Sequence, residues 1–198
     1  MPWNDYIPLL LMNMAAGLMI LGGWLFSLPG RGDRRHWAPP FGAVGLVATV
    51  TGGCMTLTWP VRGLMEAGGT TMSMVFANIA FGEPTFLLGV AFLAAAVAIG
   101  KGWPVWPVAV YGAMAGLVGI VLGARIWQAG LTQAPIPSAL GFLATGLTAV
   151  LTLPSLTFAW PILRRLTAGL AVLTGLYWTF LALMSYWMHV TAATKLGM

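Results

Sequence analysis

Six long apolar runs dominate the sequence, and each has about the length that a helix needs to cross a membrane. They cover approximately residues 6–28, 39–59, 82–100, 104–126, 136–160 and 166–190. A hydrocarbon core about 30 Å thick requires roughly 20 apolar residues at a rise of 1.5 Å each. The pattern predicts an all-α integral membrane protein, a bundle of about six transmembrane helices.

The composition excludes a sizeable soluble domain. Apolar residues make up 59% of the 198 residues and charged residues 7%, whereas a soluble domain has about 25% charged residues. We therefore expect a single transmembrane domain over residues 1–198, in contact with membrane lipids. An ordinary cytosolic enzyme and a nucleic-acid-binding protein are excluded on the same ground.

Prolines lie mainly at or near the ends of the predicted spans, as expected because proline suits a first helical turn and interrupts a helix interior. Pro154 is the exception, deep inside the fifth span. We expect a kink there.

The basic residues are distributed unequally between the two sides of the predicted bundle. One side carries Arg31, Arg34, Arg35, Lys101, Arg164 and Arg165. The other carries Arg62, Arg125 and Lys195. Because cytoplasmic loops of membrane proteins carry an excess of Lys and Arg, we expect a cell-membrane protein with the 29–38 loop in the cytoplasm and both termini outside.

Tryptophan prefers the membrane–water interface, and its positions agree with these spans. Nine of the ten tryptophans lie near a predicted interface. Trp178 is the exception, because it falls near the middle of the last span.

Glycines line one face of two predicted spans. The fourth span has Gly112, Gly116, Gly119 and Gly123, at spacings of four, three and four. The second span has Gly42, Gly45 and Gly52 on a similar stripe. Lipid provides no hydrophobic drive between helices, so small residues that allow close backbone approach favour packing. We expect both faces to meet other helices, in this bundle or in a partner chain.

The two halves of the chain resemble each other at an offset of about half its length. The segment Gly45–Thr49 resembles Gly141–Thr145, and Trp59-Pro60 resembles Trp160-Pro161. With three spans each, the half repeats 1–100 and 101–198 would lie upside down to each other. Inverted repeats of this kind recur among secondary transporters. Chance alignment of apolar sequence is the alternative explanation.

The third span contains the strongest candidate for a functional site. Gly82-Glu83-Pro84 follows a long connection and predicts a short half-helix, then a helix that begins near Pro84. A carboxylate is favoured at a helix N-terminus, and at membrane depth it needs a partner or a proton. The predicted polar cluster on this outer side consists of Arg62, Asn78, Glu83, Arg125 and Gln128. It is either a structural ion pair that holds the outer loop or a site for a substrate, ion or proton.

Sulfur-containing side chains gather on the predicted outer side. Thiol, thioether and imidazole groups suit Cu(I). The candidate copper ligands are Cys54, Met55, Met184, Met188 and His189. No tight ligand motif joins them, and methionine is a common packing residue, so core packing is the preferred interpretation and copper the minor one.

Other chemistries lack the residues that they need. The sequence has two histidines, which excludes a three-histidine zinc site. His36 and His189 are predicted on opposite sides of the membrane, which excludes a bis-histidine haem. The phosphate-binding motif of ATPases and the nucleophile motif of serine hydrolases are absent from the sequence. We expect no ATP hydrolysis and no catalytic residues.

The stretch Asn78-Ile79-Ala80-Phe81-Gly82-Glu83-Pro84, which reads N-x-x-F-G-E-P, together with the earlier Thr58-Trp59-Pro60, resembles domain of unknown function family 981. This is a family of small polytopic membrane proteins of bacteria and archaea, and the likeness would cover most of the chain. The resemblance implies a polytopic membrane protein. It also marks Asn78, Gly82, Glu83 and Pro84 as a family signature.

Two classes of function remain, and the sequence favours the first narrowly. A non-catalytic membrane subunit would pack in a larger complex or a homo-oligomer and hold lipid, quinone or pigment between its helices. A small transporter or channel for a solute, ion or proton would use Glu83 near its outer mouth. Copper handling at the outer face is the third alternative.

Overall fold

The computed structural model describes residues 7–28, 32–58, 64–67, 70–73, 78–158 and 160–195. Its long helices are α1 (Ile7–Ser27), α2 (Ala38–Thr58), α4 (Glu83–Lys101), α5 (Trp106–Ala129), α6 (Pro135–Thr157) and α7 (Pro161–Lys195). Its short elements are η1 (Arg35–Trp37), β1 (Leu64–Ala67), β2 (Thr70–Ser73) and η2 (Asn78–Gly82).

Six helical segments of the described chain are long and apolar enough to cross a membrane, as the sequence predicts. They are Ile7–Ser27, Arg35–Leu57, Asn78–Lys101, Trp106–Ala129, Pro135–Thr157 and Pro161–Met188. The last begins at Pro161 instead of near residue 166, because proline at the first helical position lets α7 start at once. The chain is a polytopic membrane protein, and these membrane-spanning segments are all helical.

Proline and glycine set several helix ends. Pro84 and Pro107 lie in the first turns of α4 and α5, and α6 starts at Pro135. Gly102 and Gly130 cap the C-terminal ends of α4 and α5 at φ of 72° and 61°, a left-handed backbone that glycine adopts without a Cβ penalty. Pro154 lies inside α6, close to its last residue Thr157.

The connection between α2 and α4 differs from the expected half-helix. Strands β1 and β2 form an antiparallel hairpin in which Leu64 pairs with Ser73 and Ala67 with Thr70. The described residues directly before α4 form one π-helical turn, η2. The α-helix begins at Glu83, beside the predicted start near Pro84, but Gly82 is itself helical and η2 runs into α4 without the predicted break.

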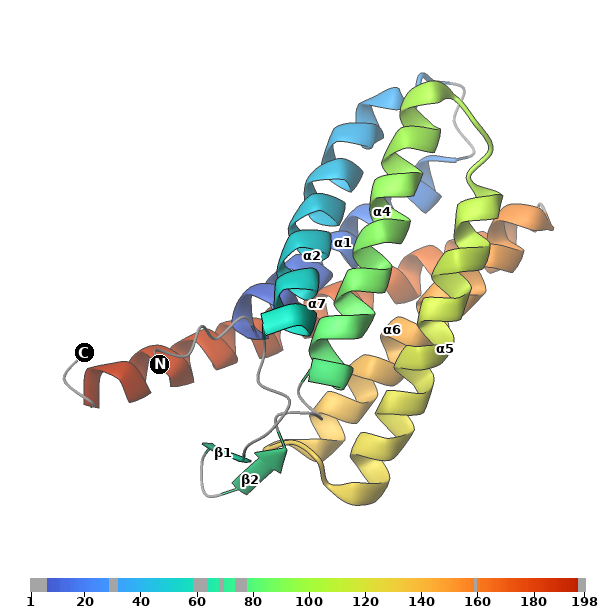
Figure 1. Ribbon diagram of the computed structural model, residues 1–198. Helices are drawn as coiled ribbons and strands as arrows, with labels where there is room; N and C mark the ends of the chain where they lie inside the picture. The colour runs from blue at the N-terminus through green and yellow to red at the C-terminus, as the bar shows by residue number, and fades with distance from the viewer. Residues whose placement is uncertain are drawn as a thin grey trace.

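The six long helices close into a ring in which each packs against two neighbours. The order around the ring is α1, α7, α6, α5, α4 and α2. Packing is tight within the pairs α1–α7, α5–α6 and α2–α4, and looser between them. In Figure 1 the α1–α7 pair crosses behind α2 and α4, and the C-terminal part of α7 projects beyond the other helices.

Glycines allow the close approach of each tight pair. A Cβ on Gly116 of α5 would lie 2.7 Å from the Gly146 carbonyl oxygen of α6. A Cβ on Gly52 of α2 would lie 2.6 Å from the Phe86 backbone nitrogen of α4, and one on Gly22 of α1 would lie 2.8 Å from the Ala168 oxygen of α7. The predicted glycine faces therefore pack against other helices at Gly45 and Gly52 of α2 and at Gly116, Gly119 and Gly123 of α5. A Cβ on Gly112, by contrast, would meet nothing within 4 Å.

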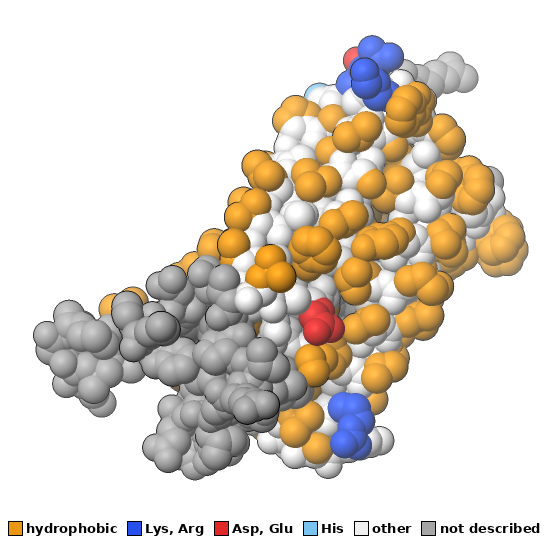
Figure 2. Space-filling model, in the orientation of Figure 1, with side chains coloured by type: hydrophobic (Ala, Val, Ile, Leu, Met, Phe, Trp, Pro, Cys, Tyr) orange, Lys and Arg blue, Asp and Glu red, His pale blue; other side chains and the backbone are white. Residues whose placement is uncertain are grey.

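The outer surface of the ring is largely apolar, and the basic side chains gather at its ends. Large side chains such as Leu46, Val121, Leu173 and Phe180 are exposed along the helices. In Figure 2 hydrophobic side chains cover most of the face between the ends, Lys and Arg appear at the two ends, and one acidic patch is exposed on the face between them. We call the end that carries Arg34, Arg35, Lys101, Arg164 and Arg165 the basic end. The hairpin and η2 lie at the opposite end.

Candidate functional site

Four cavities follow one another through the interior of the ring. Cavity A, at the basic end, has a volume of about 370 Å³ and is lined by residues that include Arg34, Trp103 and Arg164. Cavities B, C and D have volumes of about 70, 50 and 20 Å³. Cavity D reaches Phe81 of η2, so the row leads from the basic end toward the opposite end.

Neighbouring cavities share parts of their walls. Cavities A and B share Trp24, Val105 and Leu156. Cavities B and C share Leu21, Leu88, Phe92 and Ala149. Cavities C and D share Met14, Thr85, Leu88, Thr145 and Ala149. The four cavities are therefore sections of one interrupted path, separated by side chains.

The cavities lie inside the ring because several helices contribute to each. Cavity B is lined by residues from α1, α2, α4, α5 and α6, and by Val105 just before α5. Leu88 of α4 and Ala149 of α6 line all of B, C and D. These two residues mark the middle of the path.

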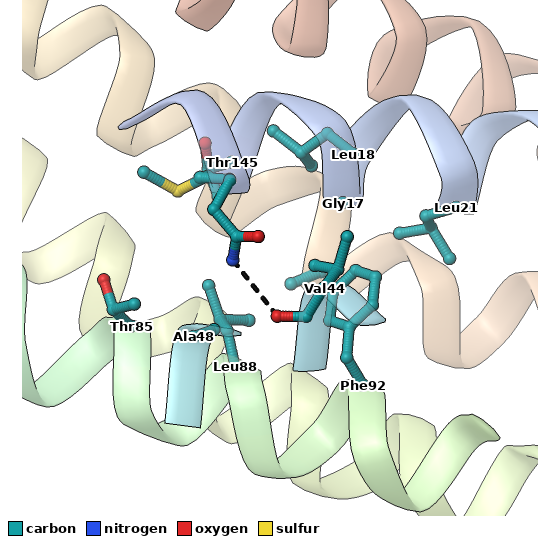
Figure 3. Close-up of a pocket in the computed structure, with 12 residues that line it drawn as sticks. Gly17, Leu18, Leu21, Val44, Ala48, Thr85, Leu88, Phe92 and Thr145 are labelled. Carbon is teal, nitrogen blue, oxygen red and sulfur yellow. Dashed lines mark hydrogen bonds between the residues drawn. The ribbon is translucent and has the colours of Figure 1, made fainter. Parts of the chain in front are cut away.

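Cavity C is shaped by a polar contact between α1 and α2. The Asn13 Nδ2 donates a hydrogen bond to the Val44 carbonyl oxygen at 3.1 Å, the dashed line in Figure 3. Beside it, a Cβ on Gly17 would lie 3.0 Å from Val44 Cγ1 and 3.1 Å from Phe92 Cζ. Asn13 and Gly17 therefore let α1 approach α2 and α4 around this cavity.

Hydroxyl groups supply most of the remaining polar lining. Thr145 donates to the Gly141 oxygen at 2.8 Å and accepts the Trp178 indole N–H at 2.7 Å. Thr152, in cavity B, donates to the Thr148 oxygen at 2.8 Å. Thr85, which borders C and D, has no hydrogen-bond partner among the described residues. Its hydroxyl can both donate to and accept from a molecule in the path.

Aromatic clusters flank cavity C on both sides. Toward the basic end, Phe41 packs against Trp24 and Phe92 with ring centroids 5.8 and 5.2 Å apart. Toward the opposite end, Phe142 meets Phe81 edge-on at 5.6 Å and Trp178 at 5.7 Å. Aromatic pairs packed in this way contribute about 0.5–1.5 kcal/mol each beyond the area that they bury.

The interior of the path carries no charge. No Asp, Glu, Lys, Arg or His lines cavities B, C or D within the described part of the chain. The charged lining side chains, Arg34 and Arg164, belong to cavity A. The chemistry available inside is therefore neutral hydrogen bonding between apolar walls.

The structure brings together some residues of the predicted polar cluster. Arg125 donates to Gln128 Oε1 at 3.2 Å, and both side chains are exposed near the end of α5. Glu83 is exposed at the start of α4, lines none of the four cavities, and has no ion pair or hydrogen bond among the described residues. Arg62 lies outside the described residues.

Asn78 packs against α2, and this packing explains why a glycine occupies position 82. Its Nδ2 lies 3.4 Å from the Thr56 carbonyl oxygen of α2, to which it donates, and its buried Oδ1 has no partner among the described residues. A Cβ on Gly82 would lie 2.7 Å from that Oδ1. A side chain at position 82 would therefore displace Asn78 from α2.

The candidate copper ligands belong to two helices that are not neighbours in the ring. On α2, Cys54 is exposed and Met55 is fully buried. On α7, Met184 and Met188 are exposed, and the side chain of His189 lies outside the described part. No group of three or more His, Cys, Asp and Glu side chains that could hold a metal ion occurs among the described residues. The copper hypothesis stays a prediction.

Sequence reasoning missed the polar residues inside the ring. Asn13, Thr85 and Thr145 lie within apolar runs, and a polar residue inside a transmembrane segment usually faces the bundle interior. The occurrence of a polar residue within an apolar run could have identified these three residues as facing the interior. It does not indicate which other helices complete the cavity.

The fold and the interior cavities define a six-helix membrane protein with an interrupted internal path. The chain belongs to the family described as "Protein of unknown function (DUF981)", whose profile matches residues 1–192. The resemblance noted in the sequence is thus confirmed. No curated protein matches the sequence.

The fold is similar to that of the Helicobacter pylori urea channel in its closed state, determined by electron cryo-microscopy. The TM-score is 0.69, with 92% of this chain and 98% of that chain covered. The sequences are 16% identical. This likeness establishes a common fold for the two chains.

Proposed function

We propose that this protein is a channel for small uncharged solutes, which cross the membrane along the axis of the ring within a single chain. The observation that carries the proposal is the row of four cavities with shared walls, from the basic end to η2. Because side chains separate the cavities from one another, the structure corresponds to a closed state of the channel. Conduction then requires these side chains to move apart.

The neutral interior supports an uncharged solute. Moving an ion from water into a medium of low dielectric constant costs of order 20 kcal/mol in the idealised case, and cavities B to D offer no opposite charge. Asn13, Thr85 and Thr145 offer hydrogen-bonding groups to a small polar molecule instead. The related fold of a urea channel supports the same class of solute.

The basic end faces the cytoplasm in this proposal, with the protein in the cell membrane. Arg34, Arg35, Lys101, Arg164 and Arg165 are grouped there, and Lys and Arg are enriched in cytoplasmic loops. Solute then passes between cavity A inside and the η2 end outside.

The ring order supports an inverted duplication of half repeats 1–100 and 101–198 within a single transmembrane domain. A duplication requires each helix of the first half to occupy the place equivalent to its counterpart in the second half. Rotating the ring by three positions does this, because it places α1 on α5, α2 on α6 and α4 on α7. The tight pairs do not follow this exchange, because α2–α4 is tight and its counterpart α6–α7 is loose. Any duplication has therefore diverged in packing.

The sequence narrowly favours a non-catalytic subunit of a larger complex or homo-oligomer that holds lipid, quinone or pigment. It stays a prediction beside the channel. Purification from native membranes tests it, since a chain that always migrates alone and colourless contradicts it.

Solute flux into proteoliposomes tests the channel directly. Stopped-flow light scattering with urea and with glycerol is expected to show faster swelling than in empty liposomes, whereas sodium and chloride fluxes stay at background. Ala149→Leu places a larger side chain where cavities B, C and D meet and is expected to reduce urea flux to background.

Ala94→Leu is the matched control, because Ala94 is exposed on the outer face of α4 and lines no cavity. It is expected to retain the wild-type flux. The proposal is wrong if wild-type vesicles are no more permeable than empty ones to either solute, or if the two variants behave alike.

A further inference from the structure

We propose that cavity A is a binding site for a phosphate group, held by Arg164 and Arg34 at the basic end. This inference goes beyond the channel and does not depend on flux. Cavity A is the largest of the four, at about 370 Å³. Two arginines from separate elements meet in it, one just before η1 and the other in the first turn of α7.

Arg164 has an unmet hydrogen bond. Its Nε atom is buried and has no hydrogen-bond partner among the described residues. A guanidinium stays charged under all ordinary conditions and has only donors to offer. The Arg164 side chain as a whole is half-buried, and a buried donor of a charged group is costly when it is unpaired, so the arrangement favours an acceptor with negative charge.

This part of the chain offers no free carboxylate for that role. The acidic residues in the described ranges are Asp33, Glu66 and Glu83, and Glu66 belongs to β1, at the end of the ring opposite the cavity. Asp33 is exposed, and its Oδ1 accepts the Arg35 backbone N–H at 2.9 Å; Glu83 starts α4 at the opposite end. The undescribed residues that follow Leu28 and precede Trp160 in the sequence, 29–31 and 159, contain no acidic residue. The counter-ion must therefore come from outside the chain.

A phosphate group fits the donors that line the cavity, chiefly the Arg164 guanidinium, since Nη2 of Arg34 already donates to the Leu28 carbonyl oxygen. Arginine forks bind phosphate oxygens in a bidentate manner, with charge-assisted bonds stronger than those between neutral groups. Ser155 of α6 also lines the cavity and could add a hydroxyl, although its oxygen already lies 2.7 Å from the Leu151 carbonyl and 2.8 Å from Thr167 Oγ1.

The phosphate can belong to a lipid headgroup or be free in solution. Trp103 and Trp106 line the cavity with 60% and 50% of their surface exposed, as tryptophans at the level of lipid headgroups do. Because cavity A shares Trp24, Val105 and Leu156 with cavity B, an occupant of either kind lies at the entrance to the path.

Two binding measurements on the full chain distinguish the sources. In the first, tryptophan fluorescence of protein in phosphatidylcholine nanodiscs is titrated with inorganic phosphate. In the second, the thermal unfolding temperature is compared between nanodiscs of phosphatidylcholine and nanodiscs that also contain phosphatidylglycerol. A saturable response in the first indicates free phosphate, and stabilisation in the second indicates a lipid headgroup. Either response supports the proposal if it depends on Arg164.

Arg164→Gln is expected to weaken the response by about tenfold or more, since it removes a charge-assisted pair. Arg165→Gln is the matched control, because it removes the same charge from the next residue, which is exposed and does not line the cavity. If Arg164→Gln does not fold, Arg164→Lys keeps the charge but removes the fork, and is expected to weaken binding severalfold.

The proposal is overturned if neither probe produces a response, or if the Arg164 and Arg165 variants respond equally. Both measurements are made at equilibrium and without solute flux. A failed channel assay therefore leaves this result intact, and a failed binding assay leaves the channel proposal intact.

Discussion

The indole N–H of Trp178 donates a hydrogen bond to the Thr145 hydroxyl, with Nε1 and Oγ1 2.7 Å apart. Trp178 is 2% exposed, and its ring packs where a Cβ on Gly141 would lie 2.5 Å from Cζ2. The contact joins α7 to α6 directly behind the wall of cavities C and D. It explains why this tryptophan lies within the bundle and away from the interface.

Thr145→Val is expected to destabilise the protein, because it leaves the buried indole N–H without an acceptor. The free energy of unfolding should fall by about 1–2 kcal/mol, within the range for buried and interhelical hydrogen bonds. Thermal unfolding in detergent measures the effect. Thr157→Val on the same helix is the control, since Thr157 is exposed and bonds only the Leu153 oxygen; equal losses for both variants would contradict the expectation.

Gly89→Ala is expected to destabilise the α2–α4 pair. A Cβ at Gly89 would lie 2.5 Å from the Thr49 backbone nitrogen, so a backbone has to move, at a cost of about 1–3 kcal/mol. Gly112→Ala is the comparison: a Cβ there meets nothing within 4 Å, and alanine favours a helix by up to about 1 kcal/mol. Denaturation is expected to give Gly89→Ala a lower free energy of unfolding than the wild type, and Gly112→Ala an equal or higher one.

Leu88→Ala is expected to increase solute permeability severalfold, because Leu88 borders cavities B, C and D and its truncation joins them. Stopped-flow swelling with urea measures this. Val97→Ala, on the exposed side of α4, should leave permeability unchanged. A loss of permeability in Leu88→Ala vesicles that contain folded protein would count against the axial path.

Glu83→Gln separates two versions of a transport function. The axial path predicts unchanged urea flux, since the Glu83 side chain lines none of the four cavities. A transporter that uses Glu83 as its coupling carboxylate predicts that flux is lost. The same proteoliposomes, tested with urea and with a proton gradient, distinguish the two.

The sequence alone determined the number of spans, most of their ends and the residues that allow close packing. Length and apolarity decide whether a helix can cross a bilayer, and proline and glycine act on the local backbone. The glycines of the second and fourth spans could be predicted as packing faces because only small residues let two backbones approach closely. The isolated position of Trp178 was also visible, although its partner Thr145 was not.

The tertiary structure decided which polar groups face the interior. Glu83 was the most conspicuous polar residue of the sequence, yet it is exposed, whereas Asn13, Thr85 and Thr145 line the cavities. The physical reason is that lipid and protein interior are both apolar, so the pattern of hydrophobic residues does not identify the inward face of a transmembrane helix. That face depends on how six helices rotate and pair around the ring, and only their assembled packing specifies it.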